Sequence, residues 1–325
     1  MPTAEKPLIS ILMAVYNPRL DWLKLQLDSL NAQSYPNLRL YIRDDCSPNV
    51  AFSSIESLVK TCITAFPFTL TRNEKNLGSN LTFELLTQEA EGEYFSYCDQ
   101  DDIWLPEKLS VLQQTIEKEN ATLVCSDMII IDGTGKQIAD SITKIRRHHV
   151  FHSGTGLAPS LLVSNFATGC TVLIRADIAR SSVPFCPYMV HDHYLNLVAA
   201  QRGKIISLPD TLIYYRIHSS NQTPIMAGVT DKNSYLHNRI DLLISRLQWL
   251  QDRFSDDSAL ADDISERLVW ANARKNLFIG NKEYGKTVWE YRRFGPSVSL
   301  FEIAASYMPE AIFSGFIRMA QKNII

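Results

Sequence analysis

Three aspartates lie within four residues of one another, at Asp99, Asp101 and Asp102. The apolar and aromatic run 93–97 precedes them and predicts a buried strand. Pro106 is tolerated in the first turn of a helix, so a helix is expected next. The carboxylates then stand at the carboxyl end of a strand, where open α/β sheets bind ligands. They suit Mg²⁺ or Mn²⁺ held against phosphates, and a solvated acidic turn is the alternative.

The elements that must position these groups alternate between strands and helices. The predicted strands cover 8–15, 38–43, 68–71, 93–97, 123–131 and 171–175, followed by strand-like segments at 204–207 and 211–215. Between them, apolar residues recur at helical spacing, as in Leu20, Leu23, Leu27 and Leu30. The helix that runs to Ala90 is expected to be capped by Asn80 or Thr82. This alternation predicts an α/β fold with a doubly wound sheet flanked by helices.

The turn after the first strand excludes a dinucleotide-binding fold. That turn reads Val15-Tyr16-Asn17-Pro18, where such a fold would carry G-x-G-x-x-G. If phosphates bind at this edge of the sheet, a cation and side chains therefore hold them.

Composition sets further limits. The 325 residues are 46% hydrophobic and carry a formal net charge of −3, so no nucleic-acid partner is expected. The six cysteines show no C-x-x-C pair and no zinc spacing, which is typical of thiols in a reducing compartment. We see no signal-peptide pattern and no run of 18 apolar residues. The expected location is cytoplasmic, either in solution or at the inner face of the cell membrane.

The pattern changes after about residue 231, where long helical patterns replace the strands. We therefore expect two domains, residues 1–225 and a helical extension over 226–325. The stretch 300–319 is strongly apolar, but Glu302, Pro309 and Glu310 interrupt it and make it a poor membrane span. Three interpretations stay open for it: packing on the first domain, a homodimer interface, or contact with an anionic membrane surface.

Four separated segments together resemble the family 2 glycosyltransferases, which have the GT-A fold. They are 10–17 (SILMAVYN), 43–47 (RDDCS), 76–80 (NLGSN) and 92–102, and their order and spacing match over roughly residues 8–220. Two more segments, 191–195 (HDHYL) and 215–218 (YRIH), are similar to enzymes that add rhamnose or a related sugar to bacterial surface polysaccharide. Two departures matter. His191 stands where the family often has Glu, and the Q-x-x-R-W motif of processive synthases is absent, which favours single additions.

The resemblance implies a nucleotide site at the ends of the first two strands. Tyr16 and Asp44 or Asp45 are then the residues that hold the base, because a carboxylate can accept the N–H of uracil or thymine. Asn76, Gly78 and Asn80 shape the wall of that pocket. Ordinary turn chemistry is the alternative at these aspartate, asparagine and glycine positions.

The resemblance also assigns the metal and the base. It implies that Asp99 faces the ribose or a metal-bound water, that Asp101 binds Mn²⁺ or Mg²⁺, and that His218 reaches the metal or the diphosphate. Two roles stay open for Asp102: it either joins Asp99 and Asp101 at the metal site or caps the following helix. Asp192 becomes the catalytic base, with an N-cap of its own helix as the alternative.

The function implied is inverting, metal-dependent transfer of a sugar from a nucleotide-diphospho-sugar to a glycan or lipid-linked acceptor. The favoured donor is dTDP-rhamnose, in bacterial cell-surface polysaccharide synthesis. Two alternatives remain. One is a transferase of the same fold that uses UDP-galactose, UDP-glucose or UDP-N-acetylglucosamine. The other is a non-catalytic GT-A-like module that binds a nucleotide or glycan.

Overall fold

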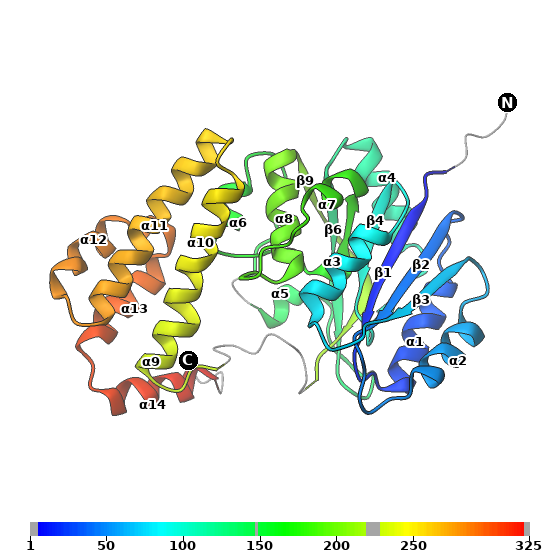
Figure 1. The fold of residues 1–325 in the computed structure, drawn as a ribbon, viewed down its shortest axis with the longest axis horizontal. Helices are drawn as coiled ribbons and strands as arrows, with labels where there is room; N and C mark the ends of the chain where they lie inside the picture. The colour runs from blue at the N-terminus through cyan, green and yellow to red at the C-terminus, as the bar shows by residue number, and fades with distance from the viewer. Residues whose placement is uncertain (1–5, 147–148, 219–227, 322–325) are drawn as a thin grey trace. The chain divides into compact units, whose positions relative to one another are not determined.

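The structure, a computed structural model, describes residues 6–146, 149–218 and 228–321. The chain folds into two units (Figure 1). The N-terminal unit comprises residues 1–185 and 189–218, and the C-terminal unit comprises residues 186–188 and 219–325. The boundary expected near residue 225 lies outside the described residues.

One mixed sheet forms the centre of the N-terminal unit, in the order β3-β2-β1-β4-β8-β6-β9-β5, with β7 paired to β6. The strands are β1 (Ile9–Val15), β2 (Leu38–Asp44), β3 (Phe68–Arg72), β4 (Tyr94–Cys98), β5 (Ile103–Trp104), β6 (Leu123–Ile131), β7 (Gln137–Ala139), β8 (Val172–Arg175) and β9 (Ile205–Arg216). Strands β1 to β4 pair in parallel, and β9 is parallel to β6. Strand β8 runs antiparallel to both β4 and β6.

These directions bring several segments to one edge of the sheet. The carboxyl ends of β1, β2, β4 and β9 lie at the same edge, because parallel strands end together. Because β8 runs the other way, the 3-10 turn that precedes it, Gly169–Thr171, lies at this edge too. This edge therefore gathers the groups that the sequence marks for chemistry.

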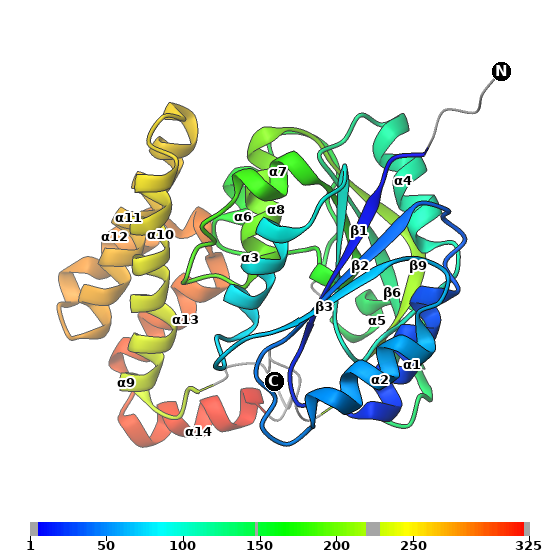
Figure 2. The same cartoon turned by 45° about the vertical axis from the view of Figure 1, so that its right-hand side comes forward.

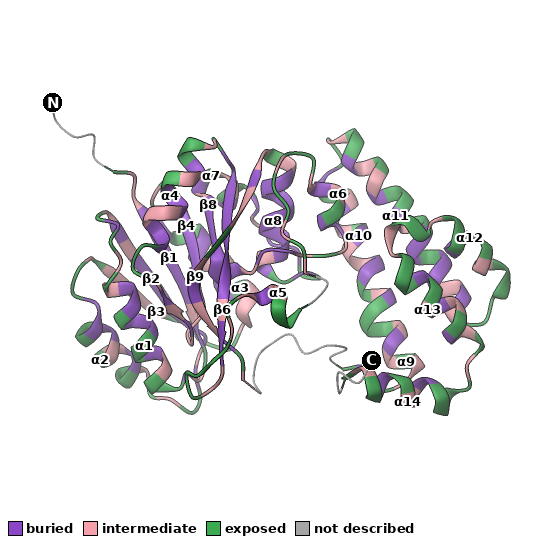
Figure 3. Ribbon diagram, turned by 180° about the vertical axis from the view of Figure 1, so that it is seen from behind, coloured by how far each residue is buried: buried purple, intermediate pink, exposed green. Residues whose placement is uncertain are grey.

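Helices cover both faces of the sheet (Figure 2). One face carries α1 (Leu20–Asn31), α2 (Phe52–Cys62) and α4 (Lys108–Lys118), and the other carries α3 (Ser79–Glu89), α7 (Ala176–Ser181) and α8 (His191–Arg202). Two short helices, α5 (Ile142–Ile145) and α6 (Ala158–Leu161), lie in the connection between β7 and the 3-10 turn. The stripe Leu23, Leu27 and Leu30 of α1 is fully buried, and most strand residues are buried as well (Figure 3). The doubly wound α/β prediction is confirmed.

Two local predictions are wrong. The segments 204–207 and 211–215 form the single strand β9, whose pairing with β6 shifts register instead of breaking. Helix α3 begins at Ser79 after Gly78, so neither Asn80 nor Thr82 caps it. Instead, Asn80 Nδ2 donates to the carbonyl oxygen of Met189 at 2.5 Å, and Thr82 Oγ1 accepts from Asn73 Nδ2 at 3.2 Å.

Every described element of the C-terminal unit is helical (Figure 1). The elements are α9 (Lys232–Tyr235), a π-helical turn (Leu236–Asp241), α10 (Leu242–Arg253), α11 (Ser258–Phe278), a 3-10 turn (Lys282–Tyr284), α12 (Gly285–Glu290), a second 3-10 turn (Arg292–Phe294), α13 (Pro296–Tyr307) and α14 (Glu310–Gln321). Glu302 of α13 is buried, and its carboxylate accepts from Arg274 Nε and Nη2, each at 2.7 Å. The hydroxyl of Tyr235 donates to the same carboxylate at 2.9 Å. The charge that interrupts the apolar stretch is thus an interior ion pair between α11 and α13.

Residues 280–287 of this unit match the pattern G-x-x-x-x-G-K-[ST] of phosphate-binding loops. A phosphate-binding loop follows a strand, whereas this segment connects α11 to α12. The side chain of Lys286 is 84% exposed, and its Nζ lies 3.8 Å from Glu290. The match is therefore a helix connection rather than a phosphate site.

Candidate active site

The turn after β4 is held in place by the end of β9. The backbone N–H of Arg216 donates to Asp102 Oδ1 at 2.9 Å, and Arg216 Nε donates to the carbonyl oxygen of Asp101 at 2.8 Å. Two residues further on, His218 Nε2 lies 2.7 Å from Asp101 Oδ2. An imidazole nitrogen and a carboxylate oxygen from residues 117 positions apart in the sequence thus meet at one point.

Asp99 and Asp102 extend this acidic cluster inward. One oxygen of each and the sulfur of Cys170 lie within 4.8 Å of one another. Burial, with the charges of Asp101 and Asp192, raises the pKa of Asp99 to about 7. Burial, with the charges of Asp101 and Asp99, raises the pKa of Asp102 well above its ordinary value. Several carboxylates are therefore buried close together here, which is an electrostatic condition that a cation relieves.

The donors present fit Mn²⁺ or Mg²⁺. Carboxylate oxygens are ligands that suit both cations, whereas the imidazole nitrogen of His218 suits a transition metal such as Mn²⁺ better than Mg²⁺. Asp102 Oδ2 is buried and accepts no hydrogen bond from any residue in the described part of the chain. Asp102 does not cap a helix, because α4 begins at Lys108 and Glu107 precedes it. Of the two interpretations left open for Asp102, the structure supports the acidic cluster.

Asp192 lies in the first turn of α8, beside the same cluster. Its Oδ2 accepts the backbone N–H of Gly169 at 3.0 Å, and its Oδ1 accepts that of His193 at 2.6 Å. Val190 precedes the helix, so Asp192 is not its N-cap. Burial raises the pKa of Asp192 to about 6, although the hydrogen bonds from Gly169 and His193 oppose the rise. A carboxylate with such a pKa is ionised at neutral pH and still basic enough to accept a proton.

The two histidines beside Asp192, His191 and His193, are buried and pack inside the protein. His191 stacks on Phe83 with ring centroids 4.1 Å apart, and burial lowers its pKa to about 3. His193 Nε2 lies 2.7 Å from the carbonyl oxygen of Leu161. Both rings therefore pack α8 against its surroundings, and the catalytic role of Asp192 stays a prediction.

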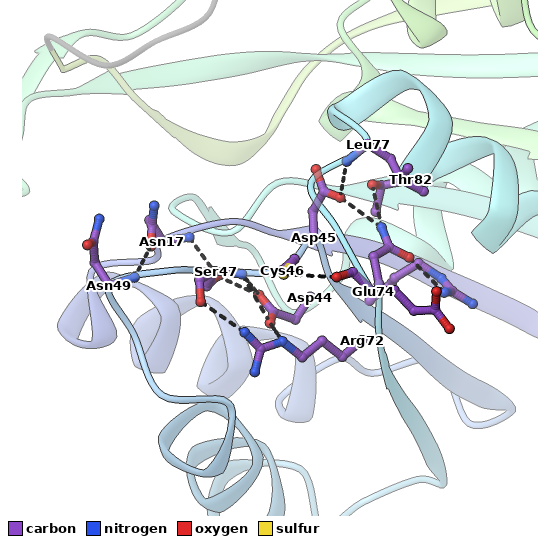
Figure 4. Close-up of polar contacts among 12 residues, drawn as sticks. Asn17, Asp44, Asp45, Cys46, Ser47, Asn49, Arg72, Glu74, Leu77 and Thr82 are labelled. Atoms are coloured by element: carbon purple, nitrogen blue, oxygen red, sulfur yellow. Dashed lines mark hydrogen bonds and ion pairs between the residues drawn. The ribbon is translucent and has the colours of Figure 1, made fainter.

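Asp44 and Asp45 are engaged by the protein itself (Figure 4). Asp44 accepts from the backbone N–H and hydroxyl of Ser47, and its Oδ2 lies 3.1 Å from Arg72 Nε. Asp45 accepts from the backbone N–H of Leu77 at 2.7 Å and of Gly78 at 2.8 Å. Both side chains are buried. These contacts support the turn interpretation, so base recognition by either carboxylate stays a prediction.

Three other residues predicted to bind the nucleotide are Tyr16, Asn76 and Gly78, which lie near the cluster formed by Asp44 and Asp45. Tyr16 is 44% exposed, and its backbone exchanges two hydrogen bonds with the side-chain amide of Gln100, at 2.8 and 3.1 Å. Gly78 has φ +81°, which an L side chain rarely adopts, and Asn76 is exposed. The Gln100 amide thus joins the Tyr16 turn to the acidic turn.

The structure brings Asp99, Asp101, Asp192 and His218 into one cluster and places Asp44, Asp45 and Gly78 in another. Sequence reasoning missed four residues that contact or adjoin the first cluster: Arg216, Cys170, Gly169 and Lys108. Arg216 adjoins His218 in the YRIH segment, which was the one available signal for it.

Comparison with known proteins decides the family. Residues 10–181, more than half of the chain, match the sequence profile described as Glycosyl transferase family 2. The chain belongs to the family 2 glycosyltransferases. As a member of this family it is an enzyme, and the resemblance of its four segments is confirmed.

Relatives and solved structures agree with this assignment. The chain is 24% identical over 296 residues to the dTDP-rhamnosyl transferase RfbG of Shigella flexneri, which spans 86% of this chain and 94% of that protein. The S. aureus TarS 1–349 structure with UDP-GlcNAc superposes with TM-score 0.57 at 14% identity, over 89% of this chain and 91% of that one. The mannosyltransferase PcManGT from Pyrobaculum calidifontis, solved with GDP-Man and Mn2+, gives 0.55 at 14% identity, over 93% and 81%. The structural likeness shows the GT-A fold.

Proposed function

We propose that this protein transfers a sugar from a nucleotide-diphospho-sugar to a hydroxyl group, with inversion at the anomeric carbon and with help from Mn²⁺ or Mg²⁺. The observation that carries the proposal is the convergence of two chemical devices at one edge of the sheet. One is the acidic cluster with the Asp101–His218 pair, and the other is the Asp192 carboxylate. Because the charge of Asp192 raises the pKa of Asp99, the two devices are electrostatically close.

Asp101 and His218 would hold the cation, with Asp99 and Asp102 beside them. When bound, the cation neutralises the donor's diphosphate and stabilises negative charge on the departing nucleotide. Asp192 accepts the proton of the acceptor hydroxyl while that oxygen forms its bond to the anomeric carbon. The bond between the anomeric carbon and the diphosphate oxygen breaks on the opposite side, which inverts the configuration. The N–H groups of Gly169 and His193 hold the carboxylate in place for this proton transfer.

The proposed donor is dTDP-rhamnose, and the proposed setting is bacterial cell-surface polysaccharide synthesis. The name of RfbG as a dTDP-rhamnosyl transferase supports this choice, because the match covers 94% of that protein. A UDP-hexose or UDP-N-acetylglucosamine is the alternative, supported by the sugar nucleotide in the TarS complex. The proposed acceptor is a glycan or a lipid-linked glycan.

A panel of sugar nucleotides tests this proposal. Purified protein with Mn²⁺ is given dTDP-rhamnose, UDP-galactose, UDP-glucose or UDP-N-acetylglucosamine, and release of the nucleotide diphosphate is measured with water as the acceptor of the sugar. We expect turnover with dTDP-rhamnose above all, and none by the Asp192→Asn variant. Efficient turnover of a UDP-sugar alone would replace the donor, and no turnover of any donor would contradict the function.

We further propose that the protein works in the cytoplasm, at the inner face of the membrane. None of the described helices is long and apolar enough to cross a membrane. However, α13 exposes Leu300 and Tyr307, and α14 exposes Ile312, Phe316 and Met319 at i, i+4 and i+7. Apolar helix faces of this kind bind membrane interfaces, and Arg318 adds a basic group among them. A second basic residue of this segment, Lys322, lies outside the described residues.

Flotation with anionic liposomes at low salt tests the membrane proposal. The matched variant carries Leu300→Ser, Ile312→Ser and Met319→Ser, since these exposed side chains can change without opening the core. A truncation near residue 296 is a poorer choice, because it would leave buried Arg274 without Glu302. We expect the full chain to float and the variant to remain in solution. If the full chain does not float, or light scattering shows that the same residues hold a homodimer, the membrane proposal is wrong.

A further inference from the structure

Lys108, the first residue of α4, is a fully buried lysine beneath the acidic turn. Its Nζ donates to the carbonyl oxygen of Cys170 at 2.7 Å and lies 3.0 Å from the centre of the Trp104 ring. Burial lowers its pKa to about 7, while the negative charges of Asp102 and Asp99 oppose that change. The amine has N–H donors in either protonation state, so the bond to Cys170 does not depend on its charge. Burying such a group is costly, which points to a role beyond filling space.

The Cys170 carbonyl belongs to the three-residue turn Gly169–Thr171. Two hydrogen bonds close this turn: the backbone N–H and the hydroxyl of Thr171 both donate to the carbonyl oxygen of Thr168, at 2.9 and 2.7 Å. Its first residue, Gly169, donates its backbone N–H to Asp192 Oδ2 at 3.0 Å. One short turn is therefore anchored to α4 through Lys108 and to α8 through Asp192.

The approach of this turn to α8 is tight. A Cβ at Gly169 would lie 3.0 Å from His191 Nε2 and 3.2 Å from Asp192 Cβ. The ring of His191 is stacked on Phe83 and has little room to withdraw. Movement of the turn is therefore transmitted directly to the first residues of α8.

We propose that Lys108 is a positioning residue that fixes the Gly169–Thr171 turn, so that the Gly169 N–H holds the Asp192 carboxylate in its reactive orientation. The inference rests on the proposed role of Asp192 as the base. Lys108 contacts neither the donor nor the acceptor. It acts through the Cys170 carbonyl, and its loss lowers the rate of proton transfer while nucleotide binding is retained.

The decisive variant is Lys108→Met, which has a similar length and no N–H donor. Methionine packs well against the Trp104 ring, so the fold is expected to persist although the Cys170 carbonyl loses its donor. Lys118→Met is the matched control, because Lys118 ends the same helix and is exposed. Gly169→Ala perturbs the same turn independently, through the Cβ contacts above.

We measure kcat and KM with dTDP-rhamnose, or with the donor of the panel that turns over best, and the Kd of the nucleotide diphosphate with Mn²⁺ by calorimetry. Misplacing a reacting group can cost about a hundredfold in rate, so we expect kcat of Lys108→Met to fall roughly 10- to 100-fold. KM, Kd and the melting temperature should stay close to wild type, and Lys118→Met should match wild type throughout. Because both substitutions act through one turn, Lys108→Met with Gly169→Ala should cost little more than the worse single variant.

Other outcomes separate this inference from the proposed function. An inactive wild type would remove the function, and with it this inference. An active wild type with an inactive Asp192→Asn variant keeps the function, and three results then overturn the role of Lys108. These are a normal kcat in Lys108→Met, a loss confined to nucleotide or Mn²⁺ binding, and multiplicative losses in the double variant.

Discussion

Asp192→Asn should separate catalysis from stability. Folding raises the pKa of Asp192 from 3.8 to about 6, a difference worth roughly 3 kcal/mol between the charged and neutral forms. The folded protein binds this proton more tightly than the unfolded chain does. The stabilisation of the fold by proton binding at Asp192 is therefore fully present below about pH 3.8. It is lost as the pH rises through about 6, so at pH 7 the ionised carboxylate destabilises the fold.

An asparagine at position 192 removes the cost of burying a charge. Its side chain, however, accepts weaker hydrogen bonds from the N–H groups of Gly169 and His193. Losing one hydrogen bond of this kind costs about 1–2 kcal/mol, so the variant should be up to about 2 kcal/mol more stable than wild type at pH 7. The difference should vanish near pH 4, where wild-type Asp192 is largely protonated. Because the amide cannot accept a proton, kcat should fall at least about a hundredfold.

Urea unfolding at pH 7 and pH 4, with kcat measured on the same preparations, provides the assay. The predicted result is an inactive variant that is at least as stable as wild type at pH 7 and no more stable at pH 4. A variant that loses stability and keeps its turnover would refute the base assignment and show a structural carboxylate instead.

Three further outcomes are expected. The wild-type rate should fall about tenfold from pH 7 to pH 5 along a limb with a pKa near 6, measured as kcat/KM, and an unchanged rate would exclude Asp192 as the titrating base. His218→Ala should weaken Mn²⁺ binding in calorimetry without lowering the melting temperature by more than a few degrees, whereas unaltered affinity would remove His218 from the metal site. Glu302→Ala should destabilise the protein by about 3–5 kcal/mol in urea, because Arg274 would remain buried without a partner, and a change below about 1 kcal/mol would show that water reaches it.

The sequence predicted the parts of the fold that depend on local pattern. The apolar runs of β1 and β6 and the leucine stripe of α1 each produce the expected element, since burial on one or two faces sets their periodicity. The position of the Asp101 turn at the end of a strand followed from the same pattern. The family and the GT-A fold also follow from residues within β1, β2 and β4.

The local sequence pattern does not predict the direction of distant strands or how they pair. Strand β8 runs against β4, and only this reversal brings Gly169 to Asp192 and Cys170 to the acidic turn. Lys108 resembled an ordinary exposed lysine at a helix start, because nothing nearby in the sequence shows that a carbonyl 62 residues away receives its N–H. The partners of Asp45 likewise lie 28 to 33 residues along the chain.

The central claim is that sugar transfer depends on a cation held by Asp101. Nucleotide diphosphate release from the best donor should be measured with Mn²⁺, then with excess chelator, and then after Mn²⁺ is restored, in wild type and in Asp101→Ala. We predict turnover that disappears with chelator and returns with Mn²⁺ in wild type, and no turnover by Asp101→Ala at the same Mn²⁺ concentration although the variant remains folded. Undiminished turnover in chelator, or a near-normal rate in Asp101→Ala, would show that sugar transfer does not depend on a cation held by Asp101.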